Sequence, residues 1–262
     1  MREITKTDAT RIKARLYLNA VLPAFEDLLQ NCESAQNALN GRSFNLRFQT
    51  SSGLKSCLEF GDQSCRFIHS RNDNSHIILH FITEDHLNRE FENDGFRVPL
   101  PIKGASRIKD IKTFKALSAA LEKALRPDEK ILQDPSFHEF HVGLQLGIAL
   151  RATIELVTHE RRSKRIMAET PEGIAHFSIG PEGYSAWLEW KNGKLTSGKG
   201  EPDRPADVNV TFKDAQTALK AVGNRIDVMA AVGLGEIQVT GLVPLADALG
   251  YIFERIPLYI EP

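Results

Sequence analysis

The residues of this chain that could bind a metal or catalyse proton transfer are a few histidines and carboxylates, and their spacing favours neither role. His138 and His141 stand three positions apart on a predicted helix, with Glu139 between them. A zinc site needs a third ligand, and the chain has no His-Glu-x-x-His pattern. His76 and His80 share one face of a predicted strand and are interpreted as structural. We therefore expect no metal and no cofactor.

Covalent catalysis and phosphate binding also lack a signature. Ser178 and Ser185 fall within predicted strands and not at a nucleophile elbow. No Ser/His/Asp or Cys/His order stands out. The glycines at positions 193 to 200 and 233 to 235 mark turns, and no Gly-Lys-Ser/Thr follows them. We expect a protein that is not an enzyme.

One basic cluster, Thr-His-Glu-Arg-Arg-Ser-Lys-Arg at residues 158–165, follows the end of a predicted helix. Cations near a helix C-terminus are favoured by the helix dipole, and this is the preferred interpretation. The cluster would also be attracted to anionic lipid headgroups by about 1 kcal/mol per residue. Peripheral membrane contact is the most that the sequence supports.

The elements that must position any site occur twice. Sliding the chain along itself by 129 positions superimposes its halves almost without gaps, and a fixed offset of about half the length indicates two copies of one unit. The matches include residues 76–85 with 205–214, Glu26 with Glu155, Phe48 with Phe177, Gly104 with Gly233, and Ile108 with Ile237. We predict units at 1–126 and 137–262, joined by a polar linker at 127–136.

Each unit reads as a helix, four strands, a helix, a strand and a helix. In the first unit these are helix 8–32, which Pro23 should kink or split, strands 44–48, 54–60, 64–70 and 76–82, helix 85–92, strand 106–111 and helix 112–125. Residues 96–104 should be irregular or a poor edge strand. In the second unit they are helix 137–159, strands 174–179, 184–190, 194–198 and 208–212, helix 215–222, strand 237–239 and a helix from 243, with an additional strand considered at 166–170.

Tight turns join most successive strands, so these should pair antiparallel, whereas a strand–helix–strand passage gives a parallel pair. The predicted class is α+β: tandem units, each with a mixed, mostly antiparallel five-stranded sheet and helices packed on one face.

Composition excludes several classes of function. A net charge of −1 gives no reason to expect nucleic-acid binding, and 42% apolar with 26% charged residues is ordinary for a soluble globular protein. We see no apolar signal core at the N-terminus and no uncharged apolar run of about 18 residues. Three cysteines fit a reducing compartment. A cytoplasmic location is expected.

Residues 206–253 resemble the type-two sterol carrier protein family, and with the preceding strands the resemblance extends over 137–253. It is carried by Ala-Asp-Val-Asn-Val-Thr-Phe-Lys-Asp at 206–214, Ala218-Leu219, Gly-Glu-Ile-Gln-Val-Thr-Gly at 235–241 and Leu-Ala-Asp-Ala-Leu at 245–249. The first half is reached only through the repeat, where Ile78 takes the place of Asp207 and Ser106-Arg107 that of Gly235-Glu236. The resemblance implies a hydrophobic tunnel between sheet and helices that holds acyl chains or sterols.

The expected function is non-catalytic binding or carriage of a lipid, sterol or other apolar small molecule by the second unit. Burial contributes roughly 0.8 kcal/mol per methylene, so about ten carbons could support micromolar affinity before ordering costs, and a simple apolar slot is a sufficient mechanism. The candidate lining residues are Phe177, Trp187, Trp190, Val210, Phe212, Met229, Leu234, Ile237, Val239, Leu245, Leu249, Ile252 and Phe253.

The alternative is a structural or interaction module with filled cores, which mediates oligomerisation or assists an enzyme. A homodimer is possible, because each unit could present the same patch. The apolar segment 252–262 could plug the pocket, cover the other unit or contact a membrane.

Overall fold

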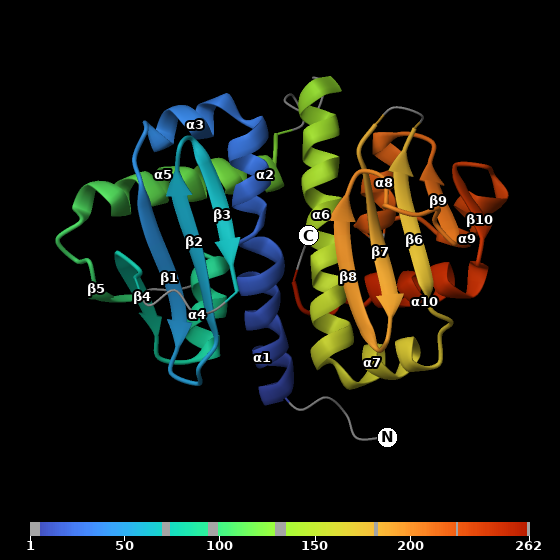
Figure 1. Ribbon diagram of the computed structural model, residues 1–262, viewed down its shortest axis with the longest axis horizontal. Coiled ribbons are helices and arrows are strands. Elements are labelled where there is room, and N and C mark those ends of the chain that lie inside the picture. Colours follow the sequence, from blue (N-terminus) through green and yellow to red (C-terminus); the bar gives the residue numbers. More distant parts are fainter. Residues whose placement is uncertain are drawn as a thin grey trace. The chain divides into compact units, whose positions relative to one another are not determined.

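The computed structural model describes residues 6–69, 74–93, 99–128, 135–180, 183–223 and 225–260. The chain divides into two compact units, Met1–Arg126 and Pro127–Pro262, each described by itself (Figure 1). Most of the linker predicted at 127–136 lies outside the described residues.

Each unit contains one five-stranded mixed sheet. In unit 1 the order is β3-β2-β1-β4-β5, and in unit 2 it is β10-β9-β6-β7-β8. Among the described strands, the only parallel pairs are β1–β4 and β6–β9, and they occupy equivalent positions in the two sheets. The bounds are β1 Phe44–Thr50, β2 Lys55–Gly61, β3 Ser64–Ile68, β4 Ile77–Phe81, β5 Leu100–Lys103, β6 Gly173–Ile179, β7 Ser185–Lys191, β8 Lys194–Lys199, β9 Val208–Phe212 and β10 Ile237–Gly241.

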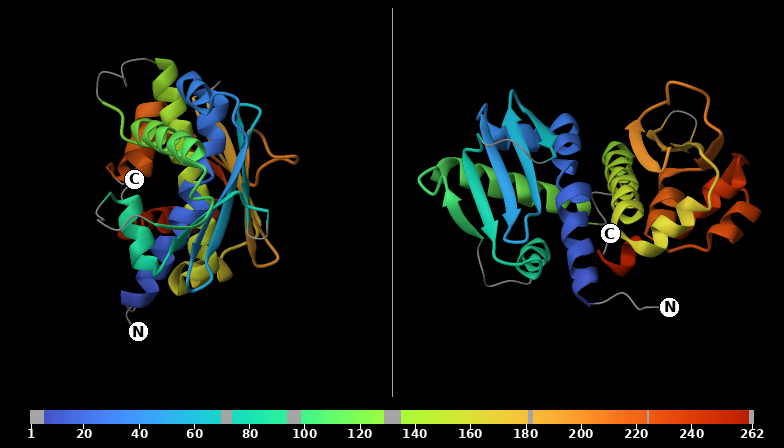
Figure 2. Two further views of the ribbon diagram at one scale, coloured as in Figure 1. Left: turned by 90° about the vertical axis from the view of Figure 1, so that its left-hand side faces the viewer. Right: turned by 60° about the horizontal axis from the view of Figure 1, so that its bottom comes forward.

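The predicted α+β class is therefore confirmed, and Figure 2 shows the sheet of unit 1 nearly edge-on with its helices to one side. Apolar alternation explains the strands, since Phe44, Leu46 and Phe48 all point to one face and are buried. Asn192 and Gly193 both have positive φ, 50° and 71°, which suits the two-residue turn between β7 and β8.

The helices of unit 1 are α1 Lys6–Leu16, the π-helical η1 Tyr17–Val21, α2 Ala24–Asn31, α3 Glu33–Leu39, α4 Glu84–Phe91 and α5 Ile108–Leu125. Those of unit 2 are α6 Pro135–His159, α7 Arg161–Ala168, α8 Ala215–Val222, α9 Val228–Gly233, α10 Val243–Phe253 and the 3₁₀ turn η3 Ile256–Leu258. The predicted interruption at Pro23 is confirmed: the N–H of Leu22 bonds to the carbonyl of Tyr17, and α2 begins after the proline. Unit 2 has no such break in α6.

One described helix is long and apolar enough to cross a membrane by length and composition alone. It is the stretch 138–159 of α6, and 83% of its most apolar window is buried inside the protein. A core helix of a globular protein passes the same test, so the burial explains its composition.

Strand pairing corrects the ungapped offset. Phe48 pairs with Leu79 in unit 1 and Phe177 with Val210 in unit 2. The first strands are thus related by 129 positions (177 − 48), but β4 and β9 by 131 (210 − 79). With this shift, Thr83 corresponds to Asp214.

Both of those residues cap the helix that follows. The Thr83 hydroxyl accepts a hydrogen bond from the N–H of His86, and the Asp214 carboxylate accepts one from the N–H of Thr217. The corrected offset therefore matches two N-caps that the ungapped one separated.

The predicted strand at 106–111 is wrong, because α5 begins at Ile108. The fifth strand of unit 1 is β5, Leu100–Lys103. Ile108 and Ile111 stand three apart, a helical spacing, and Pro101 is tolerated because β5 is an edge strand. The additional strand considered at 166–170 is also wrong, since residues 161–168 form α7.

The counterpart of Gly104 is Gly241 and not Gly233. A Cβ on Gly104 would lie 2.4 Å from the carbonyl oxygen of His76, and one on Gly241 would lie 2.2 Å from that of Asp207. Both glycines also have positive φ, whereas Gly233 has open space around it.

Candidate ligand site

The inner face of the sheet in unit 2 is continuously apolar. Phe177 on the central strand β6 pairs with Ala186 on one side and Val210 on the other, and Val210 pairs in turn with Val239. A second row joins Ile179 on β6 to Phe212 and Ile237. These rows place side chains from four strands on one surface.

Helix α10 packs against this sheet. It contacts β6, β9 and β10, and the ring of Phe253 lies 5.6 Å from that of Phe177. Ten residues of the predicted lining lie on the inner sheet face or on α10: Phe177, Trp190, Val210, Phe212, Ile237, Val239, Leu245, Leu249, Ile252 and Phe253.

Trp187 does not belong to that face. It pairs with His176 and Gly198 on the outer side of the sheet, while its neighbours Ala186 and Leu188 point inward. A Cβ on Gly198 would lie 2.3 Å from the indole ring, so the ring rests on the glycine. The period of two along β7 could have excluded Trp187 from the lining.

Met229 and Leu234 are not part of the interior either. They are 76% and 77% exposed, and Ala231 is the buried residue of α9. A helix of six residues presents less than two full turns, so one small residue covers its contact with β10.

Unit 1 fills the equivalent space with aromatic rings. Phe44 stacks on Phe60 at 4.8 Å, and Phe114 contacts Phe25, Phe48 and Phe60 at 5.6 to 6.2 Å.

At equivalent positions of its central strand, unit 2 has smaller residues. Gly173 replaces Phe44 and Ala175 replaces Leu46, by the offset of 129 that holds for these strands. The two units therefore differ in how their sheet interiors are filled.

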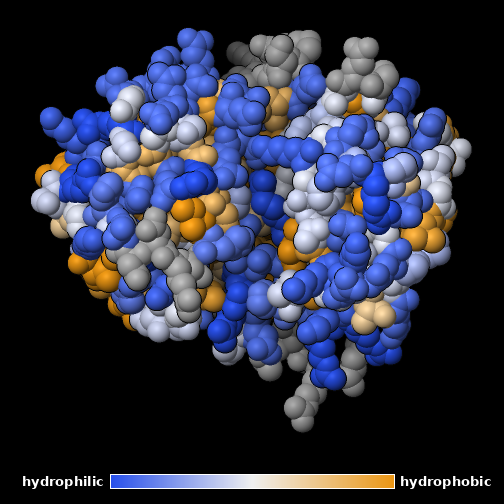
Figure 3. All heavy atoms as spheres, in the orientation of Figure 1, coloured by the Kyte–Doolittle hydropathy of each residue, from blue (hydrophilic) through white to orange (hydrophobic). Residues whose placement is uncertain are grey.

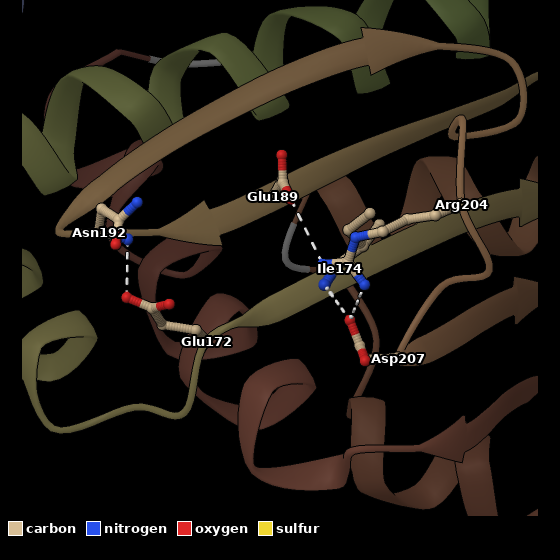
Figure 4. Close-up of polar contacts among 6 residues, drawn as sticks. All are labelled: Glu172, Ile174, Glu189, Asn192, Arg204 and Asp207. Atoms are coloured by element: carbon tan, nitrogen blue, oxygen red, sulfur yellow. Dashed lines mark hydrogen bonds and ion pairs between the residues drawn. The ribbon is translucent and has the colours of Figure 1, made fainter.

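The aspartate of the Ala206-Asp207 pair has a structural role (Figure 4). Its carboxylate accepts a hydrogen bond of 2.7 Å from the N–H of Ile174, while its own N–H donates to the carbonyl of Ile174. In unit 1, Nδ1 of His76 accepts from the N–H of Asn45 in the same way, at 3.1 Å. In each unit, one side-chain acceptor thus lies at the start of the parallel pair, which is β6–β9 in unit 2 and β1–β4 in unit 1.

The polar residues near Asp207 engage one another. Arg204 contacts Asp207 at 3.2 Å and Glu189 at 3.3 Å (Figure 4). Glu172 accepts a hydrogen bond from the N–H of Asn192. These carboxylates fix strands and turns, and they form no acid–base pair aimed at the apolar face.

Among the histidines that the sequence singled out, His80 makes structural contacts. His80 contacts Gln49 through Nδ1 and Ser51 through Nε2, at 3.3 and 3.1 Å. Within the described part of the chain, no three His, Cys, Asp or Glu side chains gather as metal ligands would.

A buried carboxylate that the sequence did not reveal holds the end of unit 2. Glu160, 1% exposed between α6 and α7, accepts hydrogen bonds from Arg255, Ser163 and Tyr259. Burial acts to raise the pKa of Glu160, but these bonds outweigh it and the pKa lies below its ordinary value of 4.5. Burial and the bond to Glu160 raise the pKa of Tyr259.

The segment 254–260, here called the C-terminal strap, is thereby fixed to its own unit. Ile256 and Ile260 are buried beside Arg255 and Tyr259, and η3 contacts α6. Glu160 with its partners Ser163, Arg255 and Tyr259 is here called the clip. A single glutamate within a basic run gives no sequence signal for it.

No family model matches the chain, and no curated protein matches it. Solved structures do match. The fold is similar to that of sterol carrier proteins. The sterol carrier protein domain 2 of Helicoverpa armigera is 18% identical with a TM-score of 0.36, over 45% of this chain and 92% of that one. Sterol carrier protein 2 of Yarrowia lipolytica is 21% identical with a TM-score of 0.33, over 40% and 84%.

An inverting sec-alkylsulfatase from a Pseudomonas species also matches. It is 14% identical with a TM-score of 0.26, over 64% of this chain and 35% of that one. Sterol carrier proteins, the family that residues 137–253 resemble, are thus among the structures that this chain matches. At these identities and TM-scores the similarity says nothing about ligand or activity.

Proposed function

We propose that unit 2 binds a lipid, sterol or other apolar small molecule between its inner sheet face and α10, without covalent chemistry. The observation that carries this proposal is the replacement of Leu46 in unit 1 by Ala175 in unit 2, on the same sheet face as Phe177. The smaller side chain of Ala175 favours a guest beside Phe177, whereas Gly173 makes room for Asp207, whose carboxylate oxygen would lie 3.0 Å from a Cβ at that glycine. Unit 1, which uses its own aromatic rings, is proposed as a structural partner.

Apolar burial alone can provide the affinity. Each methylene removed from water contributes roughly 0.8 kcal/mol, so a chain of about ten carbons supports micromolar affinity before ordering costs, and a longer chain offsets those costs. No polar anchor is needed.

The direct test is to extract the purified protein with organic solvent, identify bound compounds by mass spectrometry, and titrate displacement of a fluorescent fatty acid. We expect a bound apolar compound and saturable displacement. Absence of both would refute the proposal.

A filling variant locates the site. Ala175→Leu restores the residue type of Leu46 and should weaken ligand binding while leaving the melting temperature nearly unchanged. If the core is already filled, the same variant destabilises by about 1–3 kcal/mol through overpacking. Trp187→Leu, on the outer face of the same sheet, is the matched control and should leave binding intact.

The rival function is a structural or interaction module, including an accessory to an enzyme on another chain. The ring cluster of unit 1 favours this role for that unit. Overpacking by Ala175→Leu together with no bound compound would extend it to unit 2.

A further inference from the structure

Four cations lie within five residues on the solvent side of α7. Arg161, Arg162, Lys164 and Arg165 are exposed, whereas Ser163 is buried on the opposite side of the helix, as is Met167 one turn later. Figure 3 shows strongly hydrophilic residues over α7 at the lower edge of unit 2. This group of four is called the α7 basic face below.

The helix dipole accounts for only part of this charge, since Arg165 alone lies in the last turn of α7. As predicted, the cations follow the end of a helix: α6 ends at His159, and a new helix begins at Arg161. Arg161 and Arg162 therefore occupy the first turn of α7, where the dipole disfavours positive charge. Because they also follow the C-terminus of α6 directly, the dipoles of α6 and α7 act on them in opposite directions.

Intramolecular ion pairs do not account for them either. Arg165 pairs with Glu169 at 3.2 Å, four residues later. Within the described chain, Arg161, Arg162 and Lys164 form no ion pair, and Glu160 is occupied by Arg255. Three of the four cations, Arg161, Arg162 and Lys164, are thus exposed to solvent without an ion pair among the described residues.

The surrounding unit is acidic. Residues 127–262 hold 14 Lys and Arg against 19 Asp and Glu, a net charge of −5. The α7 basic face is therefore a local positive patch on a unit whose net charge is negative. This favours a partner that contacts α7 and not the rest of unit 2. An extended polyanion such as a nucleic acid would also meet the acidic remainder, which repels it.

The basic face is anchored to the rest of unit 2 through Ser163, on the buried side of α7. Ser163 bonds to Glu160, which is also bound by Arg255 of the C-terminal strap. The exposed cations of α7 match the surface of a bilayer whose headgroups carry negative charge.

We propose that the α7 basic face docks unit 2 on membranes that contain anionic lipid headgroups. The attraction is electrostatic, so it depends on salt. It requires no ligand in the interior and stands apart from the function proposed above.

The test is cosedimentation of the full-length protein with vesicles of phosphatidylcholine alone or mixed with phosphatidylglycerol. We expect binding to the mixed vesicles, loss of that binding at high salt, and little binding to phosphatidylcholine alone. The triple variant Arg161→Gln, Arg162→Gln, Lys164→Gln should bind at least about tenfold more weakly, since each cation near the surface contributes to attraction.

The control removes the same charge elsewhere. Lys191→Gln, Lys194→Gln, Lys213→Gln changes three exposed lysines on or next to the sheet and should retain binding. Unfolding curves must show that both variants are folded; if the triple variant is not, Arg161→Gln and Arg162→Gln are tested singly. The proposal is overturned if wild type ignores the mixed vesicles, if both variants lose binding equally, or if a DNA oligonucleotide binds as tightly at the same salt.

Discussion

Trp187 and Trp190 are the two tryptophans of the chain, and they lie on opposite faces of β7. Both were predicted to line a pocket, although residues three apart in a strand lie on opposite faces of the sheet. Trp190 is buried on the inner face, whereas Trp187 covers Gly198 on the outer one. Each reports on a different side of the sheet.

Single-tryptophan variants should separate the two faces. In Trp187→Phe, the remaining Trp190 should change its emission when an apolar ligand is added, because its surroundings change. In Trp190→Phe, the remaining Trp187 should respond little. Fluorescence titration measures both, and a response confined to Trp187 would place the ligand on the outer face.

The clip around Glu160 should be the most sensitive polar site of unit 2. Glu160→Gln leaves Arg255 buried without a countercharge, and we expect a loss of about 3–5 kcal/mol in the free energy of unfolding. Urea denaturation measures it. Glu169→Gln, which breaks an exposed pair with Arg165, should cost less than about 1 kcal/mol. Equal costs would contradict the role of the clip.

Acid should release the same clip. The pKa of Glu160 is lowered in the folded state, so its contribution to stability is present above the unfolded value near 4.5 and is lost as pH falls through the lower, folded value. Urea unfolding of wild type and Glu160→Gln at about pH 7 and about pH 3 should show the difference between them shrink in acid. A constant difference would show that the charge is not involved.

Among the elements, strands joined by tight turns were predictable, whereas β5 was predicted only as an irregular segment or poor edge strand within 96–104. Alternation in β1 and the Asn192-Gly193 turn are local signals, and the structure confirms both. β5 is four residues long, contains Pro101 and pairs with β4 through a register shift, so its pattern has no clear period. Residues 106–111 carried a stronger apolar signal, which belongs to α5.

The lining residues were predictable where a strand or a long helix set the face, as for Val210 and Leu249. Met229 and Leu234 were misplaced because α9 is too short for its period to define a buried side. Glu160 could not be found, since its partners are distant in sequence.

Glycines at the last strand of each unit should be intolerant of a side chain. Gly104→Ala and Gly241→Ala combine positive φ with a backbone clash, and each should cost more than about 1 kcal/mol. Gly233→Ala, at the end of α9, should be neutral or slightly stabilising. Thermal unfolding compares the three, and a tolerant Gly241 would contradict the close approach to Asp207.

At the scale of the whole molecule, two sheets of the same topology have differently filled interiors. If unit 2 alone takes a ligand, then hydrogen exchange should slow in β6 to β10 on ligand addition and stay unchanged in β1 to β5. Mass spectrometry of exchanged peptides measures this. Equal protection in both sheets would show that unit 1 also binds, despite its ring cluster.

The clip at Glu160 also has a consequence for the order in which the chain acquires its structure. Arg255 and Tyr259 lie 95 and 99 residues after Glu160, and all five strands of unit 2 lie between. During synthesis, unit 1 can fold as soon as it has left the ribosome, because domains generally fold as units. In unit 2, the carboxylate of Glu160 stays in water until Arg255 and Tyr259 have been synthesised. A chain that terminates before Arg255 therefore cannot form this contact.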